Sequence, residues 1–490
     1  MSELPQALYT PEQVRELDRR AIEDHAIPGG VLMARAGRAA WRLIRQRFPD
    51  ARRLLVLCGG GNNGGDGYVI ARHAAEAGLA VTLCPFAESS ALGGDARRAA
   101  DQALAAISST PFTSQCLAET DLVVDALLGT GLDRPVSGPM ADAIEAVNAS
   151  PCPVVAVDVP SGLNARTGQV MGVAIGAALT PTFIGLKQGL FTGQAADCVG
   201  EVVFDDLHVP AAVYDGIQPP AQRLGPTALA GALPRRPRTA HKGAFGHVLV
   251  IGGDHGMGGA VRIAAEAAAR SGAGLTSVAT RAGHVPALIG ARPELMVHGL
   301  EQPGDLSLLR SRADVLAVGP GLGQAEWGRA VFEAARDGDR PLVVDADGLN
   351  WLARAPERRD DWVLTPHPGE AARLLDTDVA AINRDRFAAV RAIADQYGGV
   401  AVLKGAGTLI SDGRGCDVCT EGNPGMASGG MGDALTGVIA GLLAQGLTPA
   451  AAASRGVVAH ARAADRAAVD GERGLLAGDV LEALRGVVNP

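Results

Sequence analysis

Glycine-rich loops that precede helical runs are the parts of this sequence best suited to chemistry. One of them, Gly429-Gly-Met-Gly-Asp433, leads directly into the helical run ALTGVIAGLLAQG. Glycines at the start of a helix let backbone N–H groups converge on one point, where the helix N-terminus also favours negative charge. The loop therefore predicts a site for an anion such as a phosphoryl group in transfer. Asp433 is placed to accept a proton from a hydroxyl that attacks the phosphorus, although an aspartate that only caps the helix would look the same.

Residues 56–68, VLCGGGNNGGDGY, form a second glycine loop at the end of an apolar strand. This loop has no lysine. It departs from the dinucleotide-binding fingerprint, because the next strand, LAVTLC, ends without an acidic residue for a ribose. The loop offers backbone amides and the side-chain oxygens of Asn62, Asn63 and Asp66. Oxygens suit an alkali or alkaline-earth cation as well as a polar group of a substrate.

Three more loops follow strands in the C-terminal half, and strand ends are where α/β sheets bind ligands. Lys404-Gly-Ala-Gly-Thr408 combines small residues with a hydroxyl, which suits close contact with a nucleotide phosphate. The other two are Gly319-Pro-Gly-Leu-Gly323 and Thr365-Pro-His-Pro-Gly-Glu370. A histidine beside prolines, as His367 is, is more often a turn residue than a ligand. Four such loops at strand ends shift that balance towards a ligand site.

Polar residues also follow strands in the N-terminal half. Asp125 comes in LVVDALLGTGL, and Asp158 and Ser161 come in VAVDVPSG. Each of them could equally be a turn or cap residue. Lys187 in TFIGLKQGL also follows a strand, and as a surface lysine it would need no explanation.

The composition limits the partners and the location of the chain. The 490 residues include 53 Asp and Glu against 44 Lys and Arg, which argues against nucleic acid or an anionic membrane and favours small molecules. The N-terminus lacks the charged start and apolar core of a signal peptide, so we expect a soluble, cytoplasmic protein. Seven cysteines without such a signal suggest reduced thiols. The CxxC of Cys416 and Cys419 lacks the second pair or nearby histidine of a zinc site.

Short β-rich runs alternate with alanine-rich helical runs along most of the chain. This alternation predicts the α/β class, with parallel sheets wrapped by helices in two tandem three-layer domains. It lapses between Leu207 and Gly243, where the sequence is rich in proline. We therefore expect a first domain at residues 1–220, a linker at 221–240 and a second domain at 241–490.

Motifs in both halves resemble known families. HKGAFGHVLVIGGDHGMGGA, GPGLG, VVDADGLN, TPHPGE, LKGAGTLI and GNPGMASGGMGD are similar, in this order, to the ADP-dependent NAD(P)H-hydrate dehydratase domain, a relative of the ribokinase-like kinases. VLCGGGNNGGDG, DALLGTGL, VDVPSGLNARTG and TFIGLKQGL are similar to the NAD(P)H-hydrate epimerase domain. Together the motifs resemble the family of bifunctional NAD(P)H-hydrate repair enzymes. The resemblance implies a Rossmann-like N-terminal fold and a ribokinase-like C-terminal fold.

For the C-terminal domain, the resemblance implies a dehydratase. Its substrates would be NADHX and NADPHX, in which water added to the nicotinamide ring leaves a hydroxyl at C6. The domain would use ADP, with Mg²⁺, to phosphorylate this hydroxyl, and loss of phosphate would give NAD(P)H and AMP. The implied nucleotide contacts are Lys404, Gly405, Ala406, Gly407, Thr408 and Gly432, and the implied hydrate contacts are Ala260, Gly323, His367 and Asp433. Met431 stands where ribokinase-like loops commonly have a small residue, so we expect it to narrow the anion pocket.

For the N-terminal domain, the resemblance implies an epimerase that interconverts the R and S forms at C6. Asn63, Asp125 and Ser161 match positions that bind K⁺. The implied hydrate contacts are Asn62, Asn63, Gly64, Gly65, Asp66, Gly129, Thr130, Gly131, Leu132, Asp133, Arg134, Pro135 and Asp158. Asp158 is the expected acid–base group and Lys187 a second candidate for carrying the proton. We expect a homo-oligomer.

Two other functions fit parts of the sequence. The chain could be a ribokinase-like kinase of a vitamin precursor with an appended nucleotide-binding domain, in which case the product would be a stable phosphate ester. It could also be a non-catalytic scaffold that binds NADH-like ligands without turnover.

Overall fold

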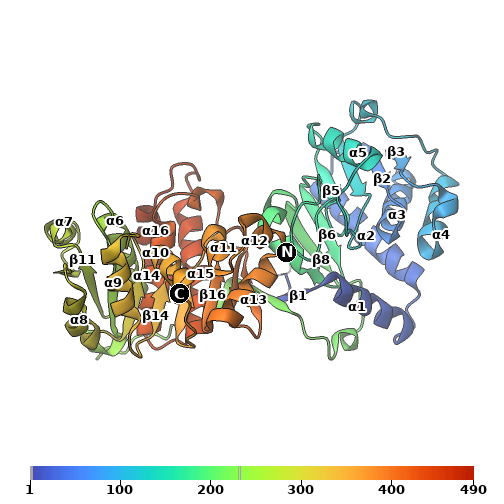
Figure 1. Ribbon diagram of the computed structural model, residues 1–490. Helices are drawn as coiled ribbons and strands as arrows, with labels where there is room; N and C mark the ends of the chain where they lie inside the picture. The colour runs from blue at the N-terminus through green and yellow to red at the C-terminus, as the bar shows by residue number, and fades with distance from the viewer. Residues whose placement is uncertain (1–3, 230, 232, 490) are drawn as a thin grey trace. The chain divides into compact units, whose positions relative to one another are not determined.

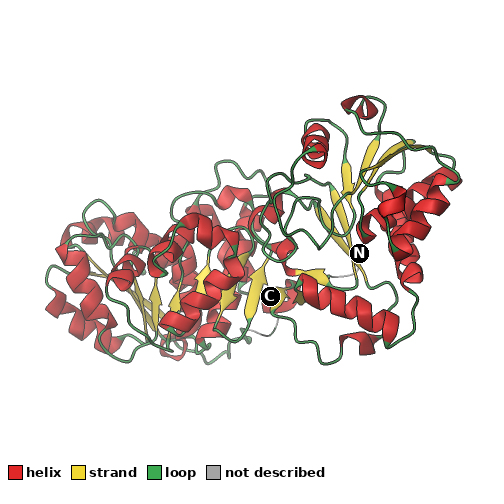
Figure 2. Cartoon of the chain, turned by 45° about the vertical axis from the view of Figure 1, so that its right-hand side comes forward, coloured by secondary structure: helices red, strands yellow, loops and turns green. Residues whose placement is uncertain are grey.

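The computed structural model describes residues 4–229, 231 and 233–489, and the chain forms two compact units. The first unit ends at Gln222 and the second begins at Arg223. Each unit has strands at its centre and helices around them (Figures 1 and 2). Each unit is described separately below.

The first unit contains a six-stranded sheet in the order β3-β2-β4-β5-β6-β8, with every neighbouring pair parallel. Its strands are β2 (Arg53–Cys58), β3 (Ala80–Pro85), β4 (Leu122–Ala126), β5 (Val154–Ala156), β6 (Leu179–Phe183) and β8 (Glu201–Asp205). The short strand β1 (Ala7–Tyr9) pairs with β7 (Leu186–Lys187) and with the start of β9 (Ala221–Leu224). The helices are α1 (Pro11–Glu23), α2 (Gly29–Arg47), α3 (Asn62–Glu76), α4 (Gly94–Leu104) and α5 (Pro139–Asn148).

Both faces of this sheet are buried, which explains why its strands are apolar throughout. Leu54, Val56 and Cys58 of β2 pack into the core that α1 to α4 cover. Leu55 and Leu57 point to the other face and pack with residues of α5. Successive side chains of a strand alternate between faces, so a strand covered on both sides must be apolar at every position.

The second unit contains parallel strands in the order β12-β11-β10-β13-β14-β15-β16, followed by antiparallel β17 and β18. The strands are β10 (His247–Ile251), β11 (Leu275–Thr280), β12 (Met296–Gly299), β13 (Val315–Val318), β14 (Leu342–Val344), β15 (Trp362–Leu364), β16 (Val400–Leu403), β17 (Thr408–Ser411) and β18 (Cys416–Cys419). The helices are α6 (Gly258–Ser271), α7 (Val285–Ala291), α8 (Leu306–Arg312), α9 (Glu326–Arg336), α10 (Asp347–Arg354), α11 (Pro368–Leu374), α12 (Val379–Arg384), α13 (Arg386–Tyr397), α14 (Met431–Ala444), α15 (Pro449–Ala467) and α16 (Ala477–Val487).

One face of this sheet packs against α6, α14, α15 and α16, whose alanines and leucines form a continuous core with Val248 and Val250 of β10. Helix α14 lies along α6 in this layer, and both contact β10. The start of α14 thereby lies at the carboxyl edge of the central strands. This packing positions the glycine-rich loop that the sequence singles out.

The stretch predicted as a linker, residues 221–240, is partly ordered into elements. Strand β9 lies where one unit ends and the next begins, and Leu229 is buried in the core of the second unit. The second unit therefore begins before residue 241. Independent folding of the two units stays a prediction.

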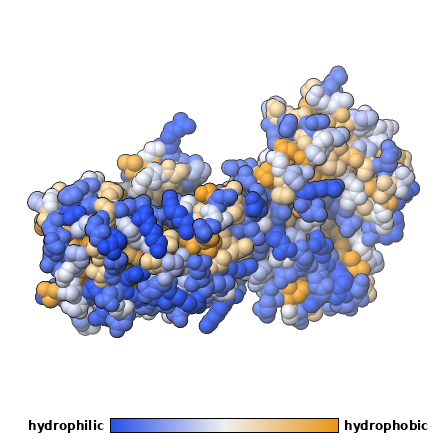
Figure 3. Space-filling view, in the orientation of Figure 1, coloured by the Kyte–Doolittle hydropathy of each residue, from blue (hydrophilic) through white to orange (hydrophobic). Residues whose placement is uncertain are grey.

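The face seen in Figure 3 carries mainly hydrophilic residues, with hydrophobic ones scattered between them. Among the described residues, no helix is both long and apolar enough to span a membrane. All seven cysteines are free, and Cys416 and Cys419 are buried on β18.

Candidate active sites

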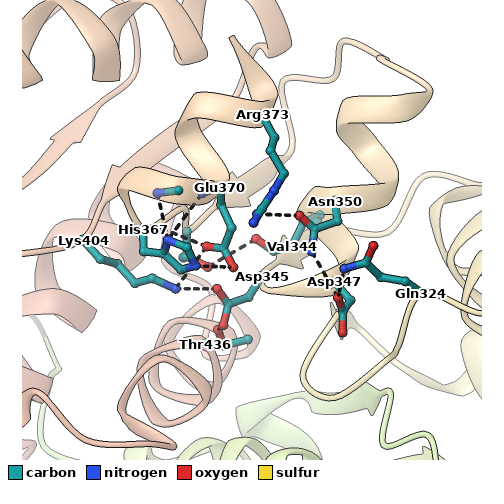
Figure 4. A network of polar contacts seen from close by, with 12 residues as sticks. Gln324, Val344, Asp345, Asp347, Asn350, His367, Glu370, Arg373, Lys404 and Thr436 are labelled. Carbon is teal, nitrogen blue, oxygen red and sulfur yellow. Dashed lines mark hydrogen bonds and ion pairs between the residues drawn. The ribbon is translucent and has the colours of Figure 1, made fainter. Parts of the chain in front are cut away.

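The second unit places a buried ion pair at the carboxyl ends of its central strands. Asp345 follows β14 and is 1% exposed, and Lys404 follows β16. Lys404 Nζ donates to Asp345 Oδ1 over 2.7 Å, and Thr436 Oγ1 on α14 donates to Asp345 Oδ2 over 2.8 Å (Figure 4). Burial disfavours the charged form of Asp345, but Lys404 and the hydrogen bonds outweigh burial and hold its pKa below the usual value. Burial alone would lower the pKa of Lys404, yet Asp345 and Glu370 raise it, so the pair stays ionised.

Glu370 lies next to this pair in the first turn of α11, which His367 caps. His367 Nδ1 accepts hydrogen bonds from the backbone N–H groups of Gly369 and Glu370, at 3.0 and 3.4 Å. The ring proton must then be on Nε2, which lies 3.2 Å from Glu370 Oε1 (Figure 4). Burial and the positive charge of Lys404 lower the pKa of His367, so the ring is neutral. Burial raises the pKa of Glu370 to about 7. Lys404 lowers this pKa and Asp345 raises it, and burial has the largest effect.

Asp433 is the third residue of α14 and faces the same charges. Burial raises its pKa to about 7, Asp345 and Glu370 raise it as well, and Lys404 lowers it. Helix α14 begins after Gly430, whose φ is +87°, and has no side-chain cap. The first N–H groups of such a helix have no partner within the helix and are available to an anion. A carboxyl group with a pKa near 7 beside an anion site can act as a base at neutral pH.

The loop after β13 is held to the same edge by Asp347. The backbone N–H of Gly323 donates to Asp347 Oδ2 over 3.0 Å. The side-chain amides of Gln324 and Asn350 donate to Asp347 Oδ1 over 3.2 and 3.1 Å (Figure 4). Asp347 thus fixes the position of a loop that the sequence predicts to contact the hydrate.

Ala260 and Gly432 also lie at this edge. A Cβ built on Gly321 would lie 3.2 Å from the Cβ of Ala260 in the first turn of α6. A Cβ built on Gly432 would lie 3.2 Å from Lys404 Nζ, so glycine leaves room beside the ammonium group.

The prediction that Met431 narrows the anion pocket is wrong, because Met431 is 6% exposed and its side chain packs in the hydrophobic core of the unit.

Gly319, at the start of the loop after β13, can be replaced only at a cost. Its φ is +124°, and a Cβ at this position would lie 1.8 Å from the backbone oxygen of Asp345. We expect Gly319→Ala to lower the free energy of unfolding by more than about 1 kcal/mol, because the strained backbone and the clash add. Gly290→Ala on α7 is the matched control, since a Cβ there meets nothing within 4 Å. Urea unfolding should show a loss for the first variant only; equal stabilities would contradict the close approach of Gly319 to Asp345.

The first unit has a cavity of about 560 Å³ at the carboxyl edge of its sheet. Most of the residues predicted to contact the hydrate line it, together with Lys187: Asn62, Asn63, Asp66, Gly129, Thr130, Gly131, Leu132, Asp133, Arg134 and Asp158. Pro135, Gly64 and Gly65 are not among the lining residues that the structure describes. Gly64 and Gly65 instead allow close packing. A Cβ on Gly64 would lie 2.0 Å from the backbone oxygen of Gly59, and a Cβ on Gly65 would lie 2.5 Å from Met33 Cε.

The three predicted K⁺ ligands are connected by hydrogen bonds, and Asn63 lines this cavity whereas Asp125 and Ser161 are not among its described lining residues. Asn63 Nδ2 donates to the backbone oxygen of Leu128 over 2.8 Å, and the backbone N–H of Leu128 donates to Ser161 Oγ over 2.8 Å. Ser161 Oγ in turn donates to Asp125 Oδ1 over 2.6 Å. Within the described part of the chain, Asn63 Oδ1 is buried without a hydrogen-bond partner. Burial raises the pKa of Asp125 to about 6, and a cation here would favour its ionised form.

Asp158 and Lys187 form an ion pair in the same cavity. Asp158 adopts a φ of +67°, a strained conformation for a residue with a side chain and one often found at functional sites. Lys187 Nζ also donates to Thr182 Oγ1 over 3.1 Å and to the backbone oxygen of Phe183 over 3.0 Å. Lys187 is 1% exposed, so it is not a surface lysine.

Comparison with full-length relatives decides the family. The chain is 49% identical over 486 residues to the bifunctional NAD(P)H-hydrate repair enzyme Nnr of Coxiella burnetii, and the alignment covers 99% of both chains. It is 46% identical to the enzyme of the same name from Escherichia coli, over 99% of this chain and 95% of that one. The chain belongs to the bifunctional NAD(P)H-hydrate repair enzymes.

Family models match the two halves of this repair enzyme separately. Residues 29–189 match the YjeF-related protein N-terminus, and residues 248–485 match the NAD(P)H-hydrate dehydratase family. A ribokinase-like superfamily protein from Enterococcus faecalis superposes with a TM-score of 0.52 at 30% identity, covering 56% of this chain and 96% of that protein. The predicted fold class, with a Rossmann-like first unit and a ribokinase-like second unit, is confirmed, as is the prediction of an enzyme.

Several residues of this repair enzyme's sites were not predicted from the sequence. Asp345 stands in the motif VVDADGLN directly after β14, and Glu370 stands in the motif TPHPGE, which follows β15. A polar residue in a loop after a strand could have indicated both. Thr436 lies inside a helix and has no such signal. Asp18 of α1 lines the first unit's cavity although it precedes residues 29–189.

Proposed function

We propose that this repair enzyme restores hydrated NADH and NADPH, the first unit by interconverting the two C6 epimers and the second by dehydrating the S epimer with ADP. The observation that carries the proposal is the carboxyl edge of the second unit. There Asp433 stands at the start of α14, next to the ionised pair of Lys404 and Asp345. An anion site, a base and a buried cation are the groups that phosphoryl transfer requires.

In the second unit, the helix start and Lys404 would hold the phosphates of ADP. Asp433 would take the proton from the C6 hydroxyl as its oxygen attacks the terminal phosphorus, and AMP would leave. The phosphate would then depart from C6 with its bonding electrons, and loss of a proton from C5 would restore the double bond of the dihydronicotinamide ring. His367, Gly323 and Ala260, at the same edge, would orient the hydrate.

Mg²⁺ fits this site as an ion that the nucleotide carries. The described residues form no group of three or more His, Cys, Asp or Glu that could hold a metal. Mg²⁺ usually keeps several waters and binds substrate phosphates with one or two carboxylates. Glu370 would be such a carboxylate, and the ion would neutralise charge on the phosphates.

The first unit would bind the hydrate in its cavity with Asp158 as the acid–base group. K⁺ fits the oxygens of Asn63, Asp125 and Ser161, because the buried Asn63 Oδ1 otherwise lacks a partner within the described chain. A cytoplasmic location and a homo-oligomeric assembly stay predictions.

The K⁺ site gives a prediction for the first unit. Asn63→Ala removes the unpartnered oxygen, so the K⁺ concentration for half-maximal epimerisation should rise about tenfold or more. Epimerisation of purified (6S)-NADHX without ADP would be followed by chromatography. The wild type in tetramethylammonium at equal ionic strength is the control and should be slow. If the variant and the wild type had the same rate at every K⁺ concentration, the result would contradict K⁺ binding by Asn63.

The products distinguish this function from a vitamin-precursor kinase. With NADHX and ADP, ³¹P NMR should show AMP and inorganic phosphate in equal amounts. Accumulation of a stable phosphate ester would support the kinase, and binding without turnover would support a scaffold.

A further inference from the structure

Helix α1 contributes a carboxyl group to the cavity of the first unit. Val14, Arg15, Asp18 and Ile22 of this helix line the cavity together with Asp158, Asp66 and Lys187. The carboxyl group of Asp18 makes no hydrogen bond and no ion pair within the described part of the chain, whereas Asp158 is paired with Lys187. A partly buried carboxyl group that lines a cavity without a protein partner is a candidate for a functional role.

The charges around Asp18 favour a proton shared among carboxyl groups. Asp18, Asp66 and Asp158 face the single ammonium of Lys187. Burial raises the pKa of Asp18 to about 6, with Lys187 lowering it and Asp158 raising it. Burial raises the pKa of Asp66 well above the usual value, and Asp158 and Asp18 raise it further whereas Lys187 lowers it. Tyr214 faces Asp18 as well, and burial raises its pKa to a range where it stays neutral. Asp18 can therefore take either protonation state near neutral pH.

Epimerisation at C6 needs an acid on one face of the ring and a base on the other. The C6 hydroxyl must leave as water from one face, and a water molecule must add to the opposite face. A single carboxyl group beside one face cannot reach both oxygens. Two carboxyl groups from separate elements can, and Asp158 follows β5 whereas Asp18 lies on α1.

Resting on the function proposed above, we propose that Asp18 is a catalytic residue of the epimerase and works as the acid–base partner of Asp158. In one direction Asp18 gives its proton to the leaving hydroxyl, the C6–O bond breaks with its electron pair going to oxygen, and the ring nitrogen forms a double bond to C6. Water then attacks C6 from the other face and loses a proton to the carboxylate of Asp158, and the electron pair returns to the nitrogen. One water leaves and one is taken up, without oxidation or reduction. The reverse direction exchanges the two roles.

The test uses the full chain and purified (6S)-NADHX without ADP, so that only epimerisation is observed. Asp18→Asn should lower kcat by about a hundredfold, the usual contribution of a positioned acid or base, with little change in KM. Asp18→Ala should be similarly slow, and formate should restore part of its rate by occupying the vacated space. Glu23→Gln is the control, since Glu23 lies on the same helix but is 62% exposed in its side chain and pairs with Arg19.

Each outcome separates this inference from the proposed function. A wild type that does not accelerate epimerisation overturns the epimerase itself. A wild type that does, with Asp18→Asn equally fast, overturns only the role of Asp18. A slow Asp18→Ala that formate does not restore, with a raised KM or a lowered unfolding temperature, makes Asp18 structural and also overturns the inference.

Discussion

Asp433→Asn is expected to lower the rate of ADP-dependent dehydration by about a hundredfold or more, the size typical of losing a positioned base. Asparagine keeps the shape of the side chain but cannot accept the proton of the C6 hydroxyl. The affinity for ADP should stay close to that of the wild type, since the glycines and Lys404 remain. Stopped-flow absorbance of the dihydronicotinamide would give the rate, and calorimetry the affinity.

The matched control for this variant is Asp479→Asn. Asp479 is also the third residue of its helix, α16, where it accepts a hydrogen bond from the backbone N–H of Leu476 over 2.9 Å. Both variants remove a negative charge from a first helical turn, which costs about 0.3–1 kcal/mol of stability. Only Asp433→Asn should slow turnover. Similar turnover in the two variants would limit Asp433 to a capping role.

The pH dependence should report the pKa of Asp433, which is about 7. The ionised form is the base, so kcat/KM should rise about tenfold per pH unit below 7 and level off above it. Asp345→Asn removes a negative charge that raises this pKa, so the break in the profile should move to lower pH. A profile without a break between pH 5 and 8 would contradict the assignment of the base.

The second large effect concerns stability. Lys404→Met should lower the free energy of unfolding by about 3 kcal/mol, because it leaves Asp345 as a buried carboxylate without its counter-charge. Asp345 is 2% exposed in its side chain and Lys404 is 19% exposed, so the pair is well shielded from water. Urea unfolding would be followed by tryptophan fluorescence, since Trp327, Trp351 and Trp362 lie in the second unit.

The sign of the pH dependence is fixed by Asp345. In the wild type its pKa is lowered, so it contributes stability above its unfolded pKa of about 4 and loses it as the pH falls. The difference between Lys404→Met and the wild type should therefore shrink as the pH falls, because burial raises the pKa of Asp345 once Lys404 is gone and the variant takes up a proton at higher pH than the wild type. The double variant Lys404→Met/Asp345→Asn should recover most of the loss.

Arg329→Met breaks exposed pairs with Glu326 and Glu333 on α9 and should cost at most about 1 kcal/mol. If Lys404→Met lost no more stability than Arg329→Met, the result would contradict a stabilising ion pair between Lys404 and Asp345.

The sequence predicted the parts of the sites that stand in glycine-rich loops after apolar strands. Lys404, Asp433 and Asn63 were predicted in this way, because such loops meet at one edge of each parallel sheet, and their roles stay predictions. Thr436 and Asp18 were missed because they lie on helical faces, and only the packing of α14 and α1 brings them to the sites. Met431 was misjudged because the loop motif does not show that its side chain turns into the core.

The α/β class and the order of the strands along the chain follow from the alternation of apolar runs with alanine-rich runs. The ordered part of residues 221–240 did not follow, because a proline-rich sequence hides a four-residue strand and the burial of Leu229. Strand pairings between residues far apart depend on tertiary contacts that a local pattern does not contain.

The most direct test of a two-step repair is the recovery of dihydronicotinamide absorbance from an equal mixture of the two NADHX epimers with the full chain, ADP, Mg²⁺ and K⁺. The wild type should restore all of the absorbance, faster than spontaneous epimerisation allows, and only with ADP present. Asp158→Ala should restore the share of the S epimer quickly and then stall. Asp433→Asn should restore almost none on the same timescale. A wild type that recovers no absorbance, or that stalls where Asp158→Ala does, would contradict the account.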